Sequence, residues 1–243
     1  MLKEKLLSLK LYGMAKSIED ELYSELTFED RLNLLLDKEI ALRQDKQLKI
    51  LLSKAKLKYT SACIEETDFK TQRGLSKSQL IEFSSNDWIK KNRNIIITGP
   101  TGAGKTYLAC ALGNSALRSG VPSLYIRLPR LLQEMKVSRA DGSYIKLLTK
   151  LSKIKLLIID DWGIDLLDEM QRRDILEIFE DRHQLRSTII TAQVPVDKWH
   201  EVIGEPTIAD AILDRIVHNA YQIKLTGESM RKKAFLSCSQ VNS

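Results

Sequence analysis

The sequence has few residues that could form a disulfide framework or a cysteine- or histidine-based metal centre. Its three cysteines, Cys63, Cys110 and Cys238, lie far apart and include no C-x-x-C pair, which excludes a zinc ribbon. Its three histidines show no metal-ligand spacing. No apolar run approaches the roughly 20 residues of a membrane span, and the N-terminus lacks the apolar core of a signal peptide. We therefore expect a cytoplasmic protein with no membrane partner.

Turn-forming residues are scarce at the start of the chain. Residues 1–70 contain no proline and a single glycine, Gly13, so long helices are expected there. Thr27, followed three residues later by Asp30, resembles a capping box and predicts the start of a helix with apolar residues at helical spacing. The sequence thus predicts a helical N-terminal module for DNA binding and oligomerisation over residues 1–70, and a second domain over 71–243.

Positive charge is concentrated within this N-terminal module. The chain carries a net charge of +6, and residues 38–58 hold seven basic residues against two acidic ones. The basic residues are Lys38, Arg43, Lys46, Lys49, Lys54, Lys56 and Lys58. A basic helix face can bind DNA phosphates without reading the base sequence. A charge run can equally be a solvated helix face, and the sequence leaves both interpretations open.

One segment predicts nucleotide binding. It fits the pattern G-x-x-x-x-G-K-[ST] and consists of Gly99, Pro100, Thr101, Gly102, Ala103, Gly104, Lys105 and Thr106. An apolar strand pattern precedes it and a helical pattern follows, so backbone N–H groups and a helix N-terminus would face the phosphates of ATP. We expect Lys105 to reach the β- and γ-phosphates and the Thr106 hydroxyl to bind Mg²⁺.

The second domain alternates predicted strands and helices. The strands are expected at residues 94–98, 123–127, 155–159, 187–191 and 221–225. Such alternation predicts an α/β fold with a five-stranded parallel sheet flanked by helices. Ligands of these sheets bind at the carboxyl ends of the strands, where the phosphate loop lies.

Polar residues follow two of these strands. The strand at 155–159 runs into Asp160 and Asp161, the arrangement in which a buried strand delivers a carboxylate to the metal. We assign Asp160 to Mg²⁺ and Asp161 to the attacking water. After the fourth strand comes Gln193, whose amide could contact the γ-phosphate. Acids that merely follow a strand, and a plain loop amide, are the alternatives.

Two arginines near the C-terminus are further candidates. Arg215 lies on the helix before the last strand and could act as an arginine finger on a neighbouring subunit's nucleotide. The alternative is a surface pair with Asp214. Arg231 could reach the phosphates within its own chain. A basic group between the second and third strands is a candidate for nucleic-acid contact, unless this segment is an ordinary crossover. It comprises Arg127, Arg130, Lys136 and Arg139.

Together these motifs resemble the IstB-like branch of the AAA+ ATPases, close to the helicase loader DnaC. The resemblance rests on 11–15, 28–32, 34–39, 99–106, 156–163, 191–193, 214–218 and 227–232. It implies the additional-strand class of sheet and an ATPase that hydrolyses ATP to ADP and phosphate. It also implies ATP-dependent binding to double-stranded DNA, assembly into a homo-oligomer, and stimulation of a partner transposase in DNA transposition.

The resemblance includes one departure and leaves two alternatives. Many AAA+ proteins have Asp-Glu where this chain has Asp160-Asp161, and the shorter second acid predicts slow hydrolysis. An arginine finger at Arg215 would in addition make hydrolysis depend on assembly. A DnaC-like helicase loader of DNA replication is one alternative function. A clamp that nucleotide binding opens and closes, with little role for hydrolysis, is the other.

Overall fold

The computed structural model describes residues 2–19, 26–65, 74 and 76–227. The chain divides into two compact units, Met1–Ser53 and Lys54–Ser243. The division falls within the long helix α3 (Phe28–Ala55). Within the described ranges, no helix combines the length and the apolar character that crossing a membrane requires.

The first unit is helical, as the sequence predicts. It contains α1 (Leu2–Ser8), α2 (Tyr12–Ser17) and most of α3. The predicted cap begins α3: the Asp30 N–H donates to Thr27 Oγ1 at 3.3 Å, and this hydroxyl donates to the Asp30 carboxylate at 2.6 Å. A small apolar core joins the three helices through Leu6, Met14, Ala15 and Leu35.

A buried carboxylate fastens α2 to α3. Glu39 accepts the Gly13 N–H at 2.5 Å, the Met14 N–H at 3.3 Å, and Arg43 Nε at 2.7 Å. Burial opposes the charge of Glu39, but these hydrogen bonds outweigh it and lower the pKa of Glu39 below its ordinary value of 4.5. A Cβ at Gly13 would lie 2.6 Å from the Lys38 carbonyl oxygen, so the approach of the two helices requires glycine.

The second unit is built on the predicted five-stranded parallel sheet, in the order β2-β3-β4-β1-β5. The strands are β1 (Asn94–Thr98), β2 (Ser123–Arg127), β3 (Leu156–Trp162), β4 (Ser187–Ala192) and β5 (Ala220–Lys224). The fold prediction is therefore confirmed. β3 extends three residues beyond its predicted end at residue 159, because Asp160 still pairs with Arg127 of β2 and Trp162 pairs with Ala192 of β4.

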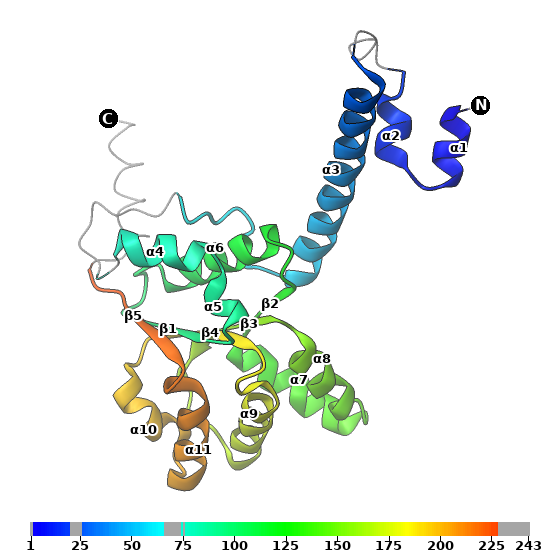
Figure 1. Cartoon of the computed structure of the whole chain (residues 1–243). Helices are drawn as coiled ribbons and strands as arrows, with labels where there is room; N and C mark the ends of the chain where they lie inside the picture. Colours follow the sequence, from blue (N-terminus) through cyan, green and yellow to red (C-terminus); the bar gives the residue numbers. More distant parts are fainter. Residues whose placement is uncertain (1, 20–25, 66–73, 75, 228–243) are drawn as a thin grey trace, which may run out of the picture. The chain divides into compact units, whose positions relative to one another are not determined.

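Helices cover both faces of the sheet (Figure 1). On one face lie α4 (Lys77–Ser84) and α6 (Lys105–Arg118), and on the other lie α7 (Leu128–Ala140), α9 (Glu169–Arg182) and α11 (Pro206–Val217). The remaining elements are α5 (Asp87–Lys90), α8 (Tyr144–Lys153), the 3₁₀ turn η2 (Val196–Lys198) and α10 (Trp199–Ile203). Alternate residues of β3 serve the two faces: Ile159 joins the core under α7 and α9, whereas Ile158 points at α6.

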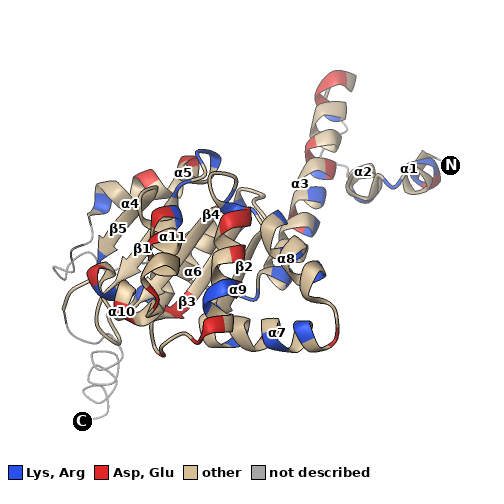
Figure 2. Ribbon diagram, turned by 90° about the horizontal axis from the view of Figure 1, so that it is seen from below, with Lys and Arg blue, Asp and Glu red and all other residues tan. Residues whose placement is uncertain are grey.

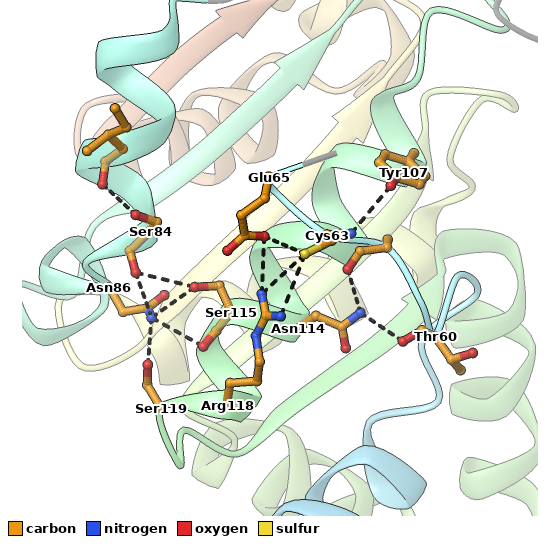
Figure 3. Close-up of polar contacts among 12 residues, drawn as sticks. Thr60, Cys63, Glu65, Ser84, Asn86, Tyr107, Asn114, Ser115, Arg118 and Ser119 are labelled. Atoms are coloured by element: carbon orange, nitrogen blue, oxygen red, sulfur yellow. Dashed lines mark hydrogen bonds and ion pairs between the residues drawn. The ribbon is translucent and has the colours of Figure 1, made fainter. Parts of the chain in front are cut away.

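The segment that follows α3 is attached to α6 (Figure 3). Asn114 Nδ2 on α6 donates to the carbonyl oxygens of Thr60 at 3.0 Å and Ala62 at 2.8 Å. The Cys63 N–H donates to the Tyr107 hydroxyl at 3.4 Å. The sequence prediction drew the domain boundary at residue 70. These contacts explain why residues before that point belong with the second unit.

Candidate nucleotide-binding site

The predicted phosphate loop connects the end of β1 to the start of α6. Gly99, Gly102 and Gly104 have φ values of 149°, 83° and 92°, a region that side chains disfavour. A Cβ at Gly99 would also lie 2.4 Å from the Leu225 carbonyl oxygen, beyond the end of β5. The glycines therefore permit a tight loop that leads directly into a helix N-terminus, the arrangement that attracts phosphate.

Lys105 lies across this loop. Its Nζ donates to the carbonyl oxygens of Gly99 at 2.7 Å and Pro100 at 2.9 Å. The side chain is buried at the first position of α6. The ammonium group is thus held at the loop, within the segment for which phosphate contact was predicted.

Thr106 and Asp160, the predicted metal pair, lie in contact. Thr106 Oγ1 donates to the two carboxylate oxygens of Asp160, at 3.0 Å and 3.1 Å. Both groups offer oxygen atoms, which are the ligands Mg²⁺ prefers. Asp160 is fully buried at the carboxyl end of the sheet. The donor chemistry of this pair therefore fits Mg²⁺ beside the phosphate loop.

Two further hydroxyls reach Asp160, and the sequence analysis missed both. The Tyr125 hydroxyl on β2 donates to Asp160 Oδ2 at 2.6 Å, and the Thr191 hydroxyl on β4 donates to Oδ1. Burial, followed by the neighbouring Asp160 carboxylate, raises the pKa of Tyr125, so its hydroxyl keeps its proton. A polar residue within an otherwise apolar strand was the available sequence signal for Tyr125 and Thr191. That signal indicates contact with Asp160 only when β2 and β4 are known to flank β3.

Asp161 has an unusual backbone and a basic partner. Its φ of 66° is left-handed, and the register between β3 and β4 shifts between Ile159 and Trp162. The Asp161 carboxylate accepts a hydrogen bond from Arg127 Nε at 2.6 Å. Strained, non-glycine left-handed residues cluster at functional sites. The predicted water-activating acid is thus paired with the last residue of β2.

Gln193 faces the phosphate loop. Thr101 Oγ1 donates to Gln193 Oε1 at 2.8 Å, so the amide contacts the loop directly. This contact joins the segment after β4 to the segment after β1, its neighbour in the sheet. The structure therefore brings together Lys105, Thr106, Asp160 and Gln193 at one edge of the sheet.

Arg215, one of the two candidate arginines, is not part of this group. Arg215 on α11 forms an ion pair with Glu180 on α9 and donates from Nη1 to the Ala211 carbonyl oxygen at 2.8 Å. Its own carbonyl oxygen lies 3.5 Å from the side-chain amide nitrogen of Asn94, the first residue of β1. The phosphate loop follows the carboxyl end of β1, so the backbone of Arg215 lies at the amino ends of the strands, opposite to the phosphate loop. Arg231 lies outside the described residues.

The basic residues expected to contact nucleic acid lie along α3 and in the segment directly after it, and at the end of β2 and along α7 (Figure 2). Several of them already hold partners. Arg139 forms an ion pair with Asp174 and lies 3.8 Å from the Tyr144 ring centroid, while Arg130 pairs with Glu134 at 3.3 Å. The three arginines of this set thus form ion pairs with acidic residues. Lys136 is exposed and forms no ion pair with the part of the chain that the structure describes.

Comparisons with known proteins agree with this geometry. A family model described as IstB-like ATP binding protein matches residues 4–237. An insertion sequence ATP-binding protein of Sinorhizobium fredii is 46% identical over 233 residues, which cover 94% of this chain and 95% of that protein. The IS1162 ATP-binding protein of Pseudomonas fluorescens is 46% identical over 191 residues, covering 77% and 83% of the two chains.

Solved structures share the fold. The crystal structure of DnaI has a TM-score of 0.60 at 24% identity and covers 73% of this chain and 94% of its own. The crystal structure of the DnaC helicase loader has a TM-score of 0.55 at 20% identity and covers 68% of this chain and 97% of its own. At these identities the likeness concerns the AAA+ sheet and its helices.

Proposed function

This chain belongs to the family of IstB-like ATP binding proteins, and we propose that it is an ATPase that assembles on double-stranded DNA and stimulates a partner transposase. The observation that carries the proposal is the meeting of Lys105, Thr106, Asp160 and Gln193 beside the phosphate loop. These residues come from three separate segments of the chain. Together they offer a cation, oxygen ligands and an amide to one small volume.

Each residue has a distinct role in the proposed reaction. Lys105 would exchange its contacts with Gly99 and Pro100 for phosphate oxygens, and Gln193 would contact the γ-phosphate. Thr106 and Asp160 would hold Mg²⁺, which neutralises charge on the phosphates. Asp161 would orient the attacking water once its contact with Arg127 is released, since a carboxylate must accept a hydrogen bond from that water.

The position of Arg215 supports a site shared between subunits. Because its backbone lies at the edge of the sheet opposite to its own phosphate loop, it is poorly placed to act on its own nucleotide. An arginine from a neighbouring subunit could stabilise charge on the transferred phosphoryl group. In this proposal the Glu180 contact holds Arg215 until a neighbour arrives. Hydrolysis would then depend on assembly.

Transposition is favoured over helicase loading by the comparisons that cover most of the chain. The relative at 46% identity over 94% of this chain, including the N-terminal unit, is named as an insertion sequence protein. DnaI and the DnaC helicase loader share the fold at 24% identity or less. Fold alone does not determine function, so the full-length similarity carries more weight.

The first experiment compares Lys105→Ala with the wild-type protein and with Lys146→Ala, an exposed lysine on α8. Filter binding measures ATP affinity, and electron microscopy of the protein with duplex DNA follows assembly with ATP, with ADP and without nucleotide. We expect Lys105→Ala to lose ATP binding and ATP-dependent assembly, and Lys146→Ala to retain both. Unchanged assembly of Lys105→Ala in ATP would contradict nucleotide control.

The second experiment tests the shared site and the partner. Arg215→Ala and Asp161→Asn are each expected to bind ATP and lose turnover, whereas a mixture of the two should regain part of it. The absence of rescue at every mixing ratio would contradict a shared site. Adding the transposase of the same insertion sequence tests stimulation of strand transfer. Stimulation of a replicative helicase in place of the transposase would support the loader alternative.

A further inference from the structure

Asp160 is surrounded by hydroxyl donors from three different elements. Thr106 on α6 donates to both carboxylate oxygens, Tyr125 on β2 donates to Oδ2 at 2.6 Å, and Thr191 on β4 donates to Oδ1. Tyr125 is 7% exposed and Thr191 is 1% exposed. A fully buried carboxylate without such donors would leave its oxygen atoms unsatisfied at a high free-energy cost, and the three hydroxyls supply these hydrogen bonds.

The three hydroxyls have different surroundings. Thr106 belongs to the phosphate loop and is itself a candidate metal ligand. Tyr125 and Thr191 approach Asp160 from the two strands that flank β3, so they hold the carboxylate from opposite sides. Two hydrogen bonds from opposite sides fix the rotation of a carboxylate about its Cβ–Cγ bond. Thr191 also accepts the Asp161 N–H at 3.3 Å, which connects it to the second acid.

We propose that Tyr125 and Thr191 are positioning residues that orient Asp160 for Mg²⁺-dependent binding and hydrolysis of ATP. This inference rests on the proposed function, because it concerns the same site. Tyr125 would act through its hydroxyl alone, and phenylalanine tests this because it keeps the buried ring and removes only the hydroxyl. Partners that orient metal ligands in this way typically change metal affinity by about 10- to 100-fold when they are removed.

The test compares Tyr125→Phe with Tyr144→Phe. Tyr144 offers a matched control because its hydroxyl also donates to a buried aspartate, Asp174, at 2.9 Å, outside the nucleotide site. We would titrate Mg²⁺ while following binding of a fluorescent ATP analogue, and separately while following phosphate release. Tyr125→Phe should need about tenfold more Mg²⁺ for half-maximal binding. Its nucleotide affinity in EDTA should equal that of the wild type, and Tyr144→Phe should match the wild type throughout.

A second pair of variants keeps the test decisive if Tyr125→Phe does not fold. Thr191→Ser retains the hydroxyl and should retain the Mg²⁺ requirement of the wild type, whereas Thr191→Val should raise it. If the wild type shows Mg²⁺-dependent nucleotide binding while Tyr125→Phe and Thr191→Val titrate within twofold of it, the positioning role is wrong. If the wild type itself binds nucleotide without any dependence on Mg²⁺, the proposed Mg²⁺-dependent ATPase function is contradicted, and the positioning role is contradicted with it.

Discussion

Each unit of the protein contains a buried carboxylate, and the two are satisfied by different donors. Asp160 in the second unit is fully buried and accepts hydrogen bonds from three hydroxyls. Glu39 in the first unit is 5% exposed and accepts hydrogen bonds from two backbone N–H groups and the Arg43 guanidinium. Burial is therefore similar in the two places, while the chemistry of the donors differs.

The donors indicate what each carboxylate can do. A hydroxyl can rotate, and its oxygen can bind a cation while its proton remains bonded to the carboxylate. A backbone N–H at a helix start has a fixed direction and offers no lone pair. The donors around Asp160 thus offer oxygen atoms suited to a cation, whereas the donors of Glu39 hold α2 against α3. Burial of an acid alone does not identify a functional site.

The largest expected effect separates the two acids by function. Asp160→Asn should reduce Mg²⁺-dependent ATP turnover by on the order of a hundredfold or more, because an amide oxygen carries no charge to attract the metal. Glu39→Gln should leave turnover per assembled subunit close to that of the wild type. Phosphate release with assembled protein measures both. Similar losses of ATP turnover in the two variants would show that the type of hydrogen-bond donor does not distinguish a functional buried acid from a structural one.

The next effect concerns two helical glycines, one in each unit. Alanine normally stabilises a helix by about 1 kcal/mol relative to glycine. At Gly13, however, the new Cβ would meet the backbone of Lys38 and Glu39, at 2.6 Å and 2.7 Å, so Gly13→Ala should destabilise the first unit by about 2 kcal/mol. At Gly113 on α6 the nearest atom is Ile158 Cδ1 at 2.7 Å, the end of a side chain that can rotate.

Gly113→Ala should therefore cost less than Gly13→Ala. Hydrogen exchange measured separately for amides of α2 and α6 reports the stability of each region. If Gly13→Ala raises the protection of α2 amides from exchange, the helix propensity of alanine outweighs its contact with the backbone of α3. The conclusion that α2 and α3 pack too closely for a side chain at position 13 would then be wrong.

The fold and part of the site were predictable because they depend on local patterns. The phosphate loop at 99–106, the apolar run before Asp160 and the cap at Thr27 each need only neighbouring residues to be read. The order of strands was not read from the sequence, and it determines which side chains surround Asp160. Tyr125 therefore escaped notice, although its strand was placed correctly.

Pairings between distant segments account for the other differences. Arg127 was predicted as a possible nucleic-acid contact, but the bulge at Asp161 brings that acid to it. Arg215 was considered as a partner of Asp214, whereas the packing of α11 on α9 gives it Glu180. The sequence shows a glycine at position 13 without showing that Lys38 lies against it. Each case depends on contacts that only the folded chain brings together.

A smaller effect should appear with pH in the first unit. Because the pKa of Glu39 is lower in the folded state than its ordinary value of 4.5, its ionised form stabilises the fold above that pH. This contribution should be lost as the pH falls below 4.5 and through the lowered pKa of the folded state. Glu39→Gln should remove that dependence from the protection of α2 amides. Identical acid profiles for the wild type and Glu39→Gln would contradict the assignment.

The smallest expected effect separates basic residues that hold the first unit together from those available to DNA. Both Lys46 and Lys49, one turn further along α3, are exposed, and Lys46 Nζ lies 4.6 Å from the Tyr12 ring centroid. If Lys49 contacts a phosphate, Lys49→Glu should make the negative slope of log affinity against log salt less steep by about 0.9. Lys46→Glu should in addition reduce protection of α2, because the cation–π contact is lost.

Lys153→Glu on α8 provides the control, because it makes the same change of charge at an exposed position of the other unit. DNA affinity over a range of salt concentrations distinguishes the outcomes. A change of slope confined to Lys49→Glu would place a phosphate contact on α3. Equal changes in Lys49→Glu and Lys153→Glu would mean that total charge, and not a site on α3, governs DNA binding, since a general electrostatic attraction does not depend on which unit carries the charge.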